Sequence, residues 1–135
     1  MHKTASAIFV IAAFLALSGR SGAATSYTCP KVRPVTVRCV RGTIIDQAGE
    51  PVSLATVALL RDHRVLATMQ TDQNGEFSFQ SVEAGHYDLR AEYPGFLANQ
   101  YPIVVSTARK CKRSLEMVIN VGASPNCPNA RVVKR

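Results

Sequence analysis

The chain has 135 residues with 16 Lys and Arg, 9 Asp and Glu, and a formal net charge of +7. This length is sufficient for one domain with a buried core and excludes two domains of ordinary size. The moderate basic excess suits a soluble exported protein, and it would also favour anionic polysaccharide, lipid headgroups or nucleic acid as partners.

Residues 1–24 have the pattern of a secretory signal peptide. Lys3 supplies a positive charge, residues 7–17 form an apolar run, and small residues at 22–24 suit cleavage by signal peptidase. The run is shorter than the roughly 20 residues that span a bilayer, and no later stretch comes closer, so we expect no transmembrane segment. The sequence therefore predicts a secreted or periplasmic protein, in which 14 Lys and Arg and 9 Asp and Glu leave a net charge of +5.

Four segments in the first half of the mature chain have the alternating apolar and polar residues typical of strands. Residues 35–46 form the first strand, which ends at the turn cluster QAGEP. Residues 54–61 and 65–71 form a hairpin joined by DHR. The turn DQNG supplies Asx side chains and a glycine, and residues 76–80 then form the fourth strand. The turn resembles the start of a calcium loop, but the later ligands are missing, so we interpret it as a hairpin turn.

Three more strands are predicted in the second half, at residues 86–93, 101–106 and 114–121. Seven short strands with no helical period predict an all-β fold, a seven-stranded antiparallel β-sandwich of the Ig or transthyretin type. We expect this sandwich at residues 37–121. The segments 25–36 and 122–135, rich in Pro, Asn and basic residues, are predicted to be an N-terminal tail and a C-terminal basic tail at the surface.

The first predicted strand carries two arginines and one of the four cysteines of the chain. The charged residues Arg38 and Arg41 are expected to protect an edge strand from uncontrolled pairing with other chains. All four cysteines follow the signal, and an even number in an exported chain predicts disulfides. Parallel pairing of the first and last strands would place Cys39 near Cys111 and leave Cys29 for Cys127. The alternative joins each cysteine to its neighbour in the sequence and would fasten only the tails.

Glycines, turn residues and apolar positions occur in a fixed order along the predicted strands. They are Gly42, Asp46, Gly49, Pro51, Ala55, Val57 and Leu59, followed by Thr71, Asp72, Gly75, Phe77, Phe79, Val82, Gly85, Tyr87, Leu89 and Gly95. This order resembles the carboxypeptidase regulatory-like domain, a transthyretin-like β-sandwich. The resemblance implies an accessory or interaction module, because such domains accompany peptidases, outer-membrane receptors and sugar-active enzymes. Fold alone does not confer any one of these roles.

The sequence lacks the residue patterns of metallocarboxypeptidases, of serine hydrolases with a GxSxG elbow, and of Cys/His zinc sites. A metallocarboxypeptidase needs an HxxE pair, but His63 is followed by RVL and His86 by YDL. No GxSxG elbow and no Cys/His spacing typical of zinc sites is present. We therefore predict that the chain is not an enzyme and has no cofactor and no metal site. Tyr87 is interpreted as a core residue whose hydroxyl meets a backbone acceptor.

Two groups of residues are candidates for ligand contact. Aromatic side chains around the PGF loop would form a small platform for a sugar ring. The basic run RKCKR is either a solvated loop or a patch for anionic glycan or lipid headgroups. Because no aromatic residue is interleaved with the basic ones, we do not predict a nucleic-acid partner. The candidates are Tyr93, Phe96, Tyr101, Arg109, Lys110, Lys112 and Arg113.

The predicted function is a non-catalytic interaction or scaffolding module that binds a protein partner at the cell envelope, through an edge strand or the loops at one end. The alternative is a carbohydrate-binding module that acts through the three aromatic residues and nearby basic residues.

Overall fold

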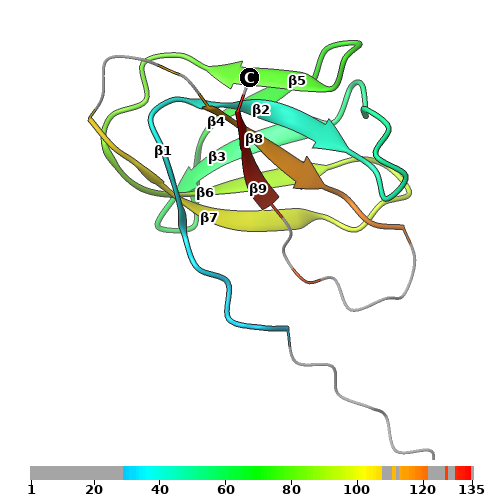
Figure 1. Cartoon of the computed structure of the whole chain (residues 1–135), viewed down its shortest axis with the longest axis horizontal. Coiled ribbons are helices and arrows are strands. Elements are labelled where there is room, and N and C mark those ends of the chain that lie inside the picture. Colours follow the sequence, from blue (N-terminus) through cyan, green and yellow to red (C-terminus); the bar gives the residue numbers. More distant parts are fainter. Residues whose placement is uncertain (1–28, 108–110, 112, 122–126, 128–129, 135) are drawn as a thin grey trace, which may run out of the picture.

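Two β-sheets packed face to face make up the described part of the chain, which in this computed structural model comprises residues 29–107, 111, 113–121, 127 and 130–134 (Figure 1). The predicted signal peptide lies outside these residues. One sheet has the strand order β1-β7-β6-β3-β4 and the other has the order β5-β2-β8-β9. The strands are β1 (Val35–Val37), β2 (Val40–Ile45), β3 (Thr56–Arg61), β4 (Arg64–Gln70), β5 (Glu76–Phe79), β6 (Gly85–Glu92), β7 (Asn99–Val105), β8 (Arg113–Val118) and β9 (Ala130–Lys134).

All seven predicted strands are present, and the all-β sandwich is confirmed. The first predicted strand is divided into β1 and β2 by a bend at Arg38 and Cys39. Because β1 pairs with β7 and β2 pairs with β5 and β8, the chain passes from one sheet to the other at this bend. The ninth strand, β9, lies within the segment predicted to be a tail, where it pairs with β8.

Most neighbouring strands are antiparallel, but two pairs are parallel. In one of them β2 lies beside β8, with Gly42 opposite Leu115. In the other β1 lies beside β7, with Val35 opposite Ile103. The parallel pairing of the first and last predicted strands, which the sequence interpretation assumed for the cysteines, is therefore confirmed.

The core forms because alternate side chains of each strand point into the space between the sheets. The pattern is clearest in β2 and β6, where buried and half-buried residues alternate. Strand β3 has four consecutive buried residues, so both of its faces are covered, and within its sheet it lies between β6 and β4. The largest fully buried apolar side chains are Ile44, Leu89, Ile103, Leu115, Met117 and Ile119.

Two turns with the sequence DQxGE have the same geometry. In each, the aspartate Oδ1 accepts hydrogen bonds from the backbone N–H groups two and four residues later, at 2.8 and 2.9 Å for Asp46 and at 2.9 and 2.8 Å for Asp72. Each turn needs a glycine because its backbone is left-handed there, with φ of 86° at Gly49 and 70° at Gly75. The interpretation of DQNG as a turn fixed by an Asx side chain is confirmed.

A buried threonine joins this region to the start of β3. Thr71 Oγ1 accepts a hydrogen bond from Ala55 N–H at 2.9 Å and donates one to the Val52 carbonyl at 2.7 Å. Only 2% of Thr71 is exposed, so both hydrogen bonds are shielded from water. Thr71 therefore holds the loop before β3 against the end of β4.

Candidate functional site

Two disulfides join segments that precede β2 to segments on either side of β8. Cys39 is bonded to Cys111 with a Cα–Cα distance of 5.6 Å, and Cys29 is bonded to Cys127 with a Cα–Cα distance of 5.3 Å. This is the nested pairing rather than the local one. The inner bond joins the bend between β1 and β2 to the residues before β8, and we call this region the disulfide end of the sandwich.

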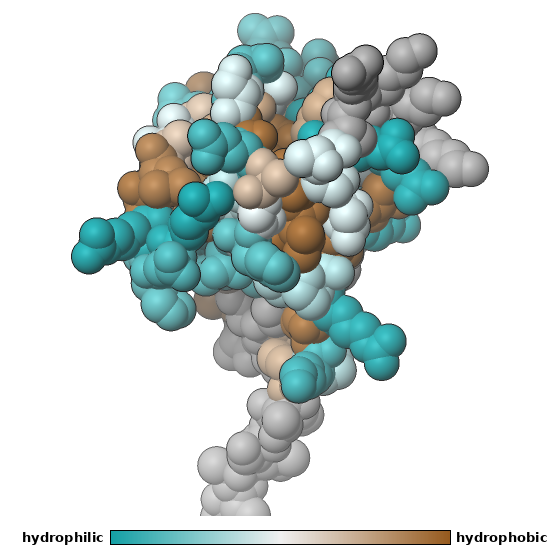
Figure 2. Space-filling model, turned by 90° about the vertical axis from the view of Figure 1, so that its left-hand side faces the viewer, coloured by the Kyte–Doolittle hydropathy of each residue, from teal (hydrophilic) through white to brown (hydrophobic). Residues whose placement is uncertain are grey.

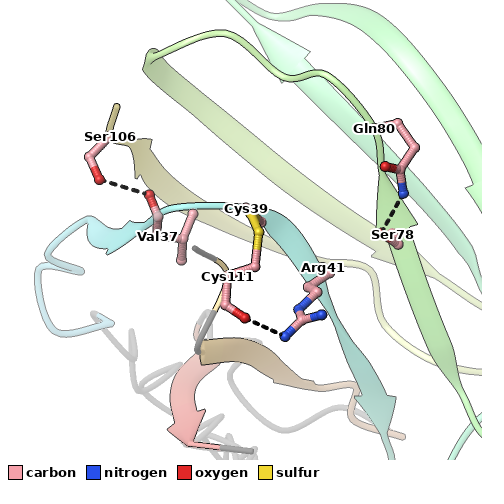
Figure 3. Close-up of a disulfide and its surroundings, with 7 residues drawn as sticks. All are labelled: Val37, Cys39, Arg41, Ser78, Gln80, Ser106 and Cys111. Carbon is pink, nitrogen blue, oxygen red and sulfur yellow. Dashed lines mark hydrogen bonds between the residues drawn. A yellow bond between two sulfur atoms is a disulfide. The ribbon is translucent and has the colours of Figure 1, made fainter. Parts of the chain in front are cut away.

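Figure 3 shows the inner disulfide between Arg41 on one side and Val37 with Ser106 on the other. On one side Arg41 Nη2 donates to the Cys111 carbonyl at 2.7 Å. Ser78 lies opposite Arg41 on the neighbouring strand and accepts a hydrogen bond from Gln80 Nε2 at 3.1 Å. On the other side the backbone N–H of Ser106 donates to the Val37 carbonyl at 2.9 Å, which ties the end of β7 to the end of β1.

Of the four basic candidates, only Arg113 is among the described residues, and it lies at this end. Arg113 is the first residue of β8 and is exposed. Arg109, Lys110 and Lys112 lie outside the described residues. Arg38, which was expected to protect an edge, is exposed at the bend between the two sheets.

The expectation that Arg41 protects an edge is wrong. Arg41 belongs to β2, which has β5 on one side and β8 on the other, so it lies in the interior of its sheet. Alternation along the strand shows which residues share a face, but it does not show whether a strand is an edge or a centre.

The aromatic candidates do not form one exposed platform. Tyr93 and Phe96 pack edge to face with their ring centroids 5.6 Å apart, and both are half-buried against the core. Tyr101 lies on β7 opposite Leu89, is half-buried, and donates its hydroxyl hydrogen to the Arg33 carbonyl at 3.3 Å. The chain therefore uses much of the surface of all three rings for its own packing.

The aromatic pair and Arg113 lie at opposite ends of the sandwich. Arg113 begins β8, whereas Leu97, next to the pair, bonds to Asn120 beyond the end of β8. The six residues of β8 extend over about 20 Å at the usual rise of a strand. A single small sugar could not contact the aromatic pair and Arg113 together.

The sequence interpretation named no residue of β4, a largely exposed strand, as a candidate for ligand contact. Six of its seven residues are exposed, and β3 is its only neighbour among the described strands. Val65 is 50% exposed and Leu66 is 55% exposed. Leu66 has no partner on β3, because Leu60 pairs with Val65 and Leu59 with Ala67. The only sequence signal was the uncharged run VLATM, which reads equally well as a buried strand.

Tyr87 has structural partners, and the described residues contain no metal site. Tyr87 is 6% exposed and donates its hydroxyl hydrogen to the Glu83 carbonyl at 2.9 Å, as interpreted from the sequence. Arg61 stacks over the Tyr87 ring, with its guanidinium carbon 4.5 Å from the centroid. In the described part of the chain no three His, Cys, Asp or Glu side chains are grouped so that they could hold a metal ion. None of the described segments is a helix of the length and hydropathy that crossing a membrane requires.

Comparison with known proteins agrees with this architecture. The solved structure of 5-hydroxyisourate hydrolase from Klebsiella pneumoniae is similar with a TM-score of 0.53 and 23% sequence identity, and the match covers 72% of this chain and 97% of that one. At this identity the likeness shows the fold alone, which is transthyretin-like. No curated protein matches the chain. The family model described as "Carboxypeptidase regulatory-like domain" matches residues 39–117, which is more than half of the chain and includes β2 to β7 and most of β8. The chain belongs to the carboxypeptidase regulatory-like domain family.

Proposed function

We propose that this chain is an exported, non-catalytic interaction module, and that a protein partner at the cell envelope covers its β4 edge. This proposal rests on the exposure of Val65 and Leu66, which lie on a strand whose only neighbour among the described strands is β3. Export is supported by the signal-like pattern of residues 1–24 and by the two disulfides, which persist in oxidising compartments.

The register of β4 favours contact through side chains over simple addition of a strand. The bulge at Leu66 interrupts the ladder, and such a bulge hinders pairing with a further strand. The same irregularity leaves two adjacent apolar side chains exposed. Burying the rest of Leu66 under a partner would contribute about 1–2 kcal/mol at the usual coefficient for apolar area. A shallow apolar groove on the partner would suit this pair.

The proposal is tested by recovering partners with a tagged mature chain from the envelope fraction of the source organism. Leu66→Glu places a charge in the contact, and Leu66→Lys repeats the change with the opposite sign. Val121→Glu is the matched control, since Val121 is an apolar residue of similar exposure, 47%, outside β4. We expect one protein to be recovered with the wild type and with the control, and to be depleted about tenfold with both Leu66 variants.

Three other outcomes would redirect the proposal. Equal recovery with all variants would remove β4 as the contact surface. Self-association that Leu66→Glu abolishes would make the partner a second copy of the chain. A glycan-array signal lost on Tyr93→Ala would favour the carbohydrate-binding alternative.

The non-catalytic part of the proposal has a test of its own. The Klebsiella neighbour is a 5-hydroxyisourate hydrolase. We expect the purified chain to leave 5-hydroxyisourate unchanged above the background rate, and turnover of this compound would show that the module is an enzyme.

A further inference from the structure

The disulfide end holds a hollow that the proposed function does not use. Its volume is about 480 Å³, and its lining residues are Thr36, Val37, Arg38, Ser106 and Arg113. Figure 2 views the molecule from this end, and hydrophilic residues form most of the visible outline. The volume falls in the range of about 300–1,000 Å³ that is usual for sites of small ligands.

The inner disulfide brings the two arginines of the hollow together. The bond between Cys39 and Cys111 joins segments that are 72 residues apart in the sequence. Because Arg38 directly precedes Cys39 and Arg113 follows Cys111 by two residues, the bond places both arginines at the same end of the sandwich. The hydrogen bond from Ser106 N–H to the Val37 carbonyl fixes the opposite wall. The hollow is therefore formed by strand ends that are fastened to one another.

The charge of the hollow is uncompensated among the described residues. Neither Arg38 nor Arg113 forms an ion pair among the described residues, in which the ion pairs join Arg90 to Glu92 and Arg131 to Glu116. The lining includes two guanidinium groups and the hydroxyls of Thr36 and Ser106, and it includes no carboxylate. Guanidinium groups stay charged at any physiological pH and offer paired N–H donors that match the oxygens of phosphate.

We propose that this hollow binds a phosphate group carried on a small polar molecule or on a lipid headgroup. The arginine N–H groups and the Thr36 hydroxyl would donate hydrogen bonds to the phosphate oxygens, whereas the Ser106 hydroxyl already donates to the Val37 carbonyl at 3.4 Å. Hydrogen bonds from the charged guanidinium groups are the stronger ones. The organic part of the ligand would occupy the space beside Val37. The site shares no residue with β4, so its test is independent of the test of the proposed function.

The test uses the disulfide-bonded mature chain and two probes. Glycerol 3-phosphate is titrated by calorimetry as the soluble phosphate ester, and vesicles containing phosphatidic acid are compared with neutral vesicles in a sedimentation assay. The variants are Arg38→Gln and Arg113→Gln. Arg64→Gln is the matched control, because it removes the same charge from an exposed arginine that does not line the hollow. Circular dichroism confirms that each variant is folded.

We expect saturable binding that Arg38→Gln and Arg113→Gln each weaken about tenfold, the usual effect of losing a charge-assisted hydrogen bond, while Arg64→Gln has little effect. Arg113→Lys should restore only part of the affinity, because a lysine keeps the charge but loses the paired donors. Binding of the free ester alone assigns the site to soluble phosphates, and binding of the vesicles alone assigns it to lipid headgroups. The proposal is overturned if neither probe binds, or if Arg64→Gln weakens binding as much as Arg38→Gln.

Discussion

Gly42 is a position at which adding one methyl group should harm the fold through lack of space alone. It lies within β2 between Phe77 of β5 and Leu115 of β8, and its backbone is not left-handed. A Cβ atom at Gly42 would lie 2.2 Å from the Leu115 carbonyl oxygen and 2.9 Å from the Leu115 carbonyl carbon and Cβ. Ordinary contacts of a Cβ begin at 3.4 Å, so Gly42→Ala must push β2 and β8 apart by about 1 Å.

The expected cost follows from what this displacement disturbs. Forcing an extra methyl group into a packed core costs about 1–3 kcal/mol. A weakened hydrogen bond between β2 and β8 adds about 1 kcal/mol. Alanine restricts the unfolded chain more than glycine does, and this effect offsets less than about 1 kcal/mol of the cost. We therefore expect Gly42→Ala to lower the free energy of unfolding by about 3 kcal/mol, and the Tm by roughly 12 °C for a domain of this size.

The matched control separates lack of space from backbone strain. Gly49 has a φ of +86° and nothing within 4 Å of a Cβ, so Gly49→Ala carries strain without a clash. Its cost should be about 1 kcal/mol. Urea denaturation with the disulfides intact measures both variants, and equal slopes would confirm that stability alone has changed. If Gly42→Ala is no less stable than Gly49→Ala, the close approach of β2 and β8 does not explain this glycine.

Further predictions concern the inner disulfide and two buried hydroxyls. Replacing Cys39 and Cys111 together by serine should lower the free energy of unfolding by about 3–4 kcal/mol, because the bond closes a 72-residue span, and an unchanged Tm would refute this. Thr71→Val removes two buried hydrogen bonds to the backbone and should cost about 2–3 kcal/mol in urea denaturation, whereas a cost below about 0.5 kcal/mol would show that water replaces them. Tyr87→Phe loses the hydroxyl that Arg61 and a backbone carbonyl share, so we expect a loss of about 1–2 kcal/mol, and no loss in thermal unfolding would contradict the contact.

Residues that were named together from the sequence lie together in the structure only where they are close in the sequence. Tyr93 and Phe96 are near neighbours, and they do pack together. Tyr101 follows on the next strand, and it packs on the core with its hydroxyl on the Arg33 carbonyl. Val65 and Leu66 belong to an uncharged run that the sequence cannot distinguish from a buried strand, because burial depends on which strand lies on each side.

The strands and turns, by contrast, follow from short-range chemistry that the sequence displays directly. Alternating apolar residues specify which side of a strand faces the core, and the aspartates of the two DQxGE turns bond backbone groups only two and four residues away. The count of four cysteines indicated two bridges, and the nested pairing followed once the first and last strands were placed side by side.

By itself, then, the sequence determined that this chain is a β-sandwich with these turns, because each of those features is decided within a few residues. The tertiary structure alone decided that the first strand divides between the two sheets, that residues Ala130–Lys134 form β9, and that β4 is left as an exposed edge. It also decided that Arg38 and Arg113 line one hollow at one end of the sandwich while the aromatic pair lies at the other end. These features depend on pairing between strands that are tens of residues apart, and that pairing is chosen by the packing of the whole core rather than by any local pattern.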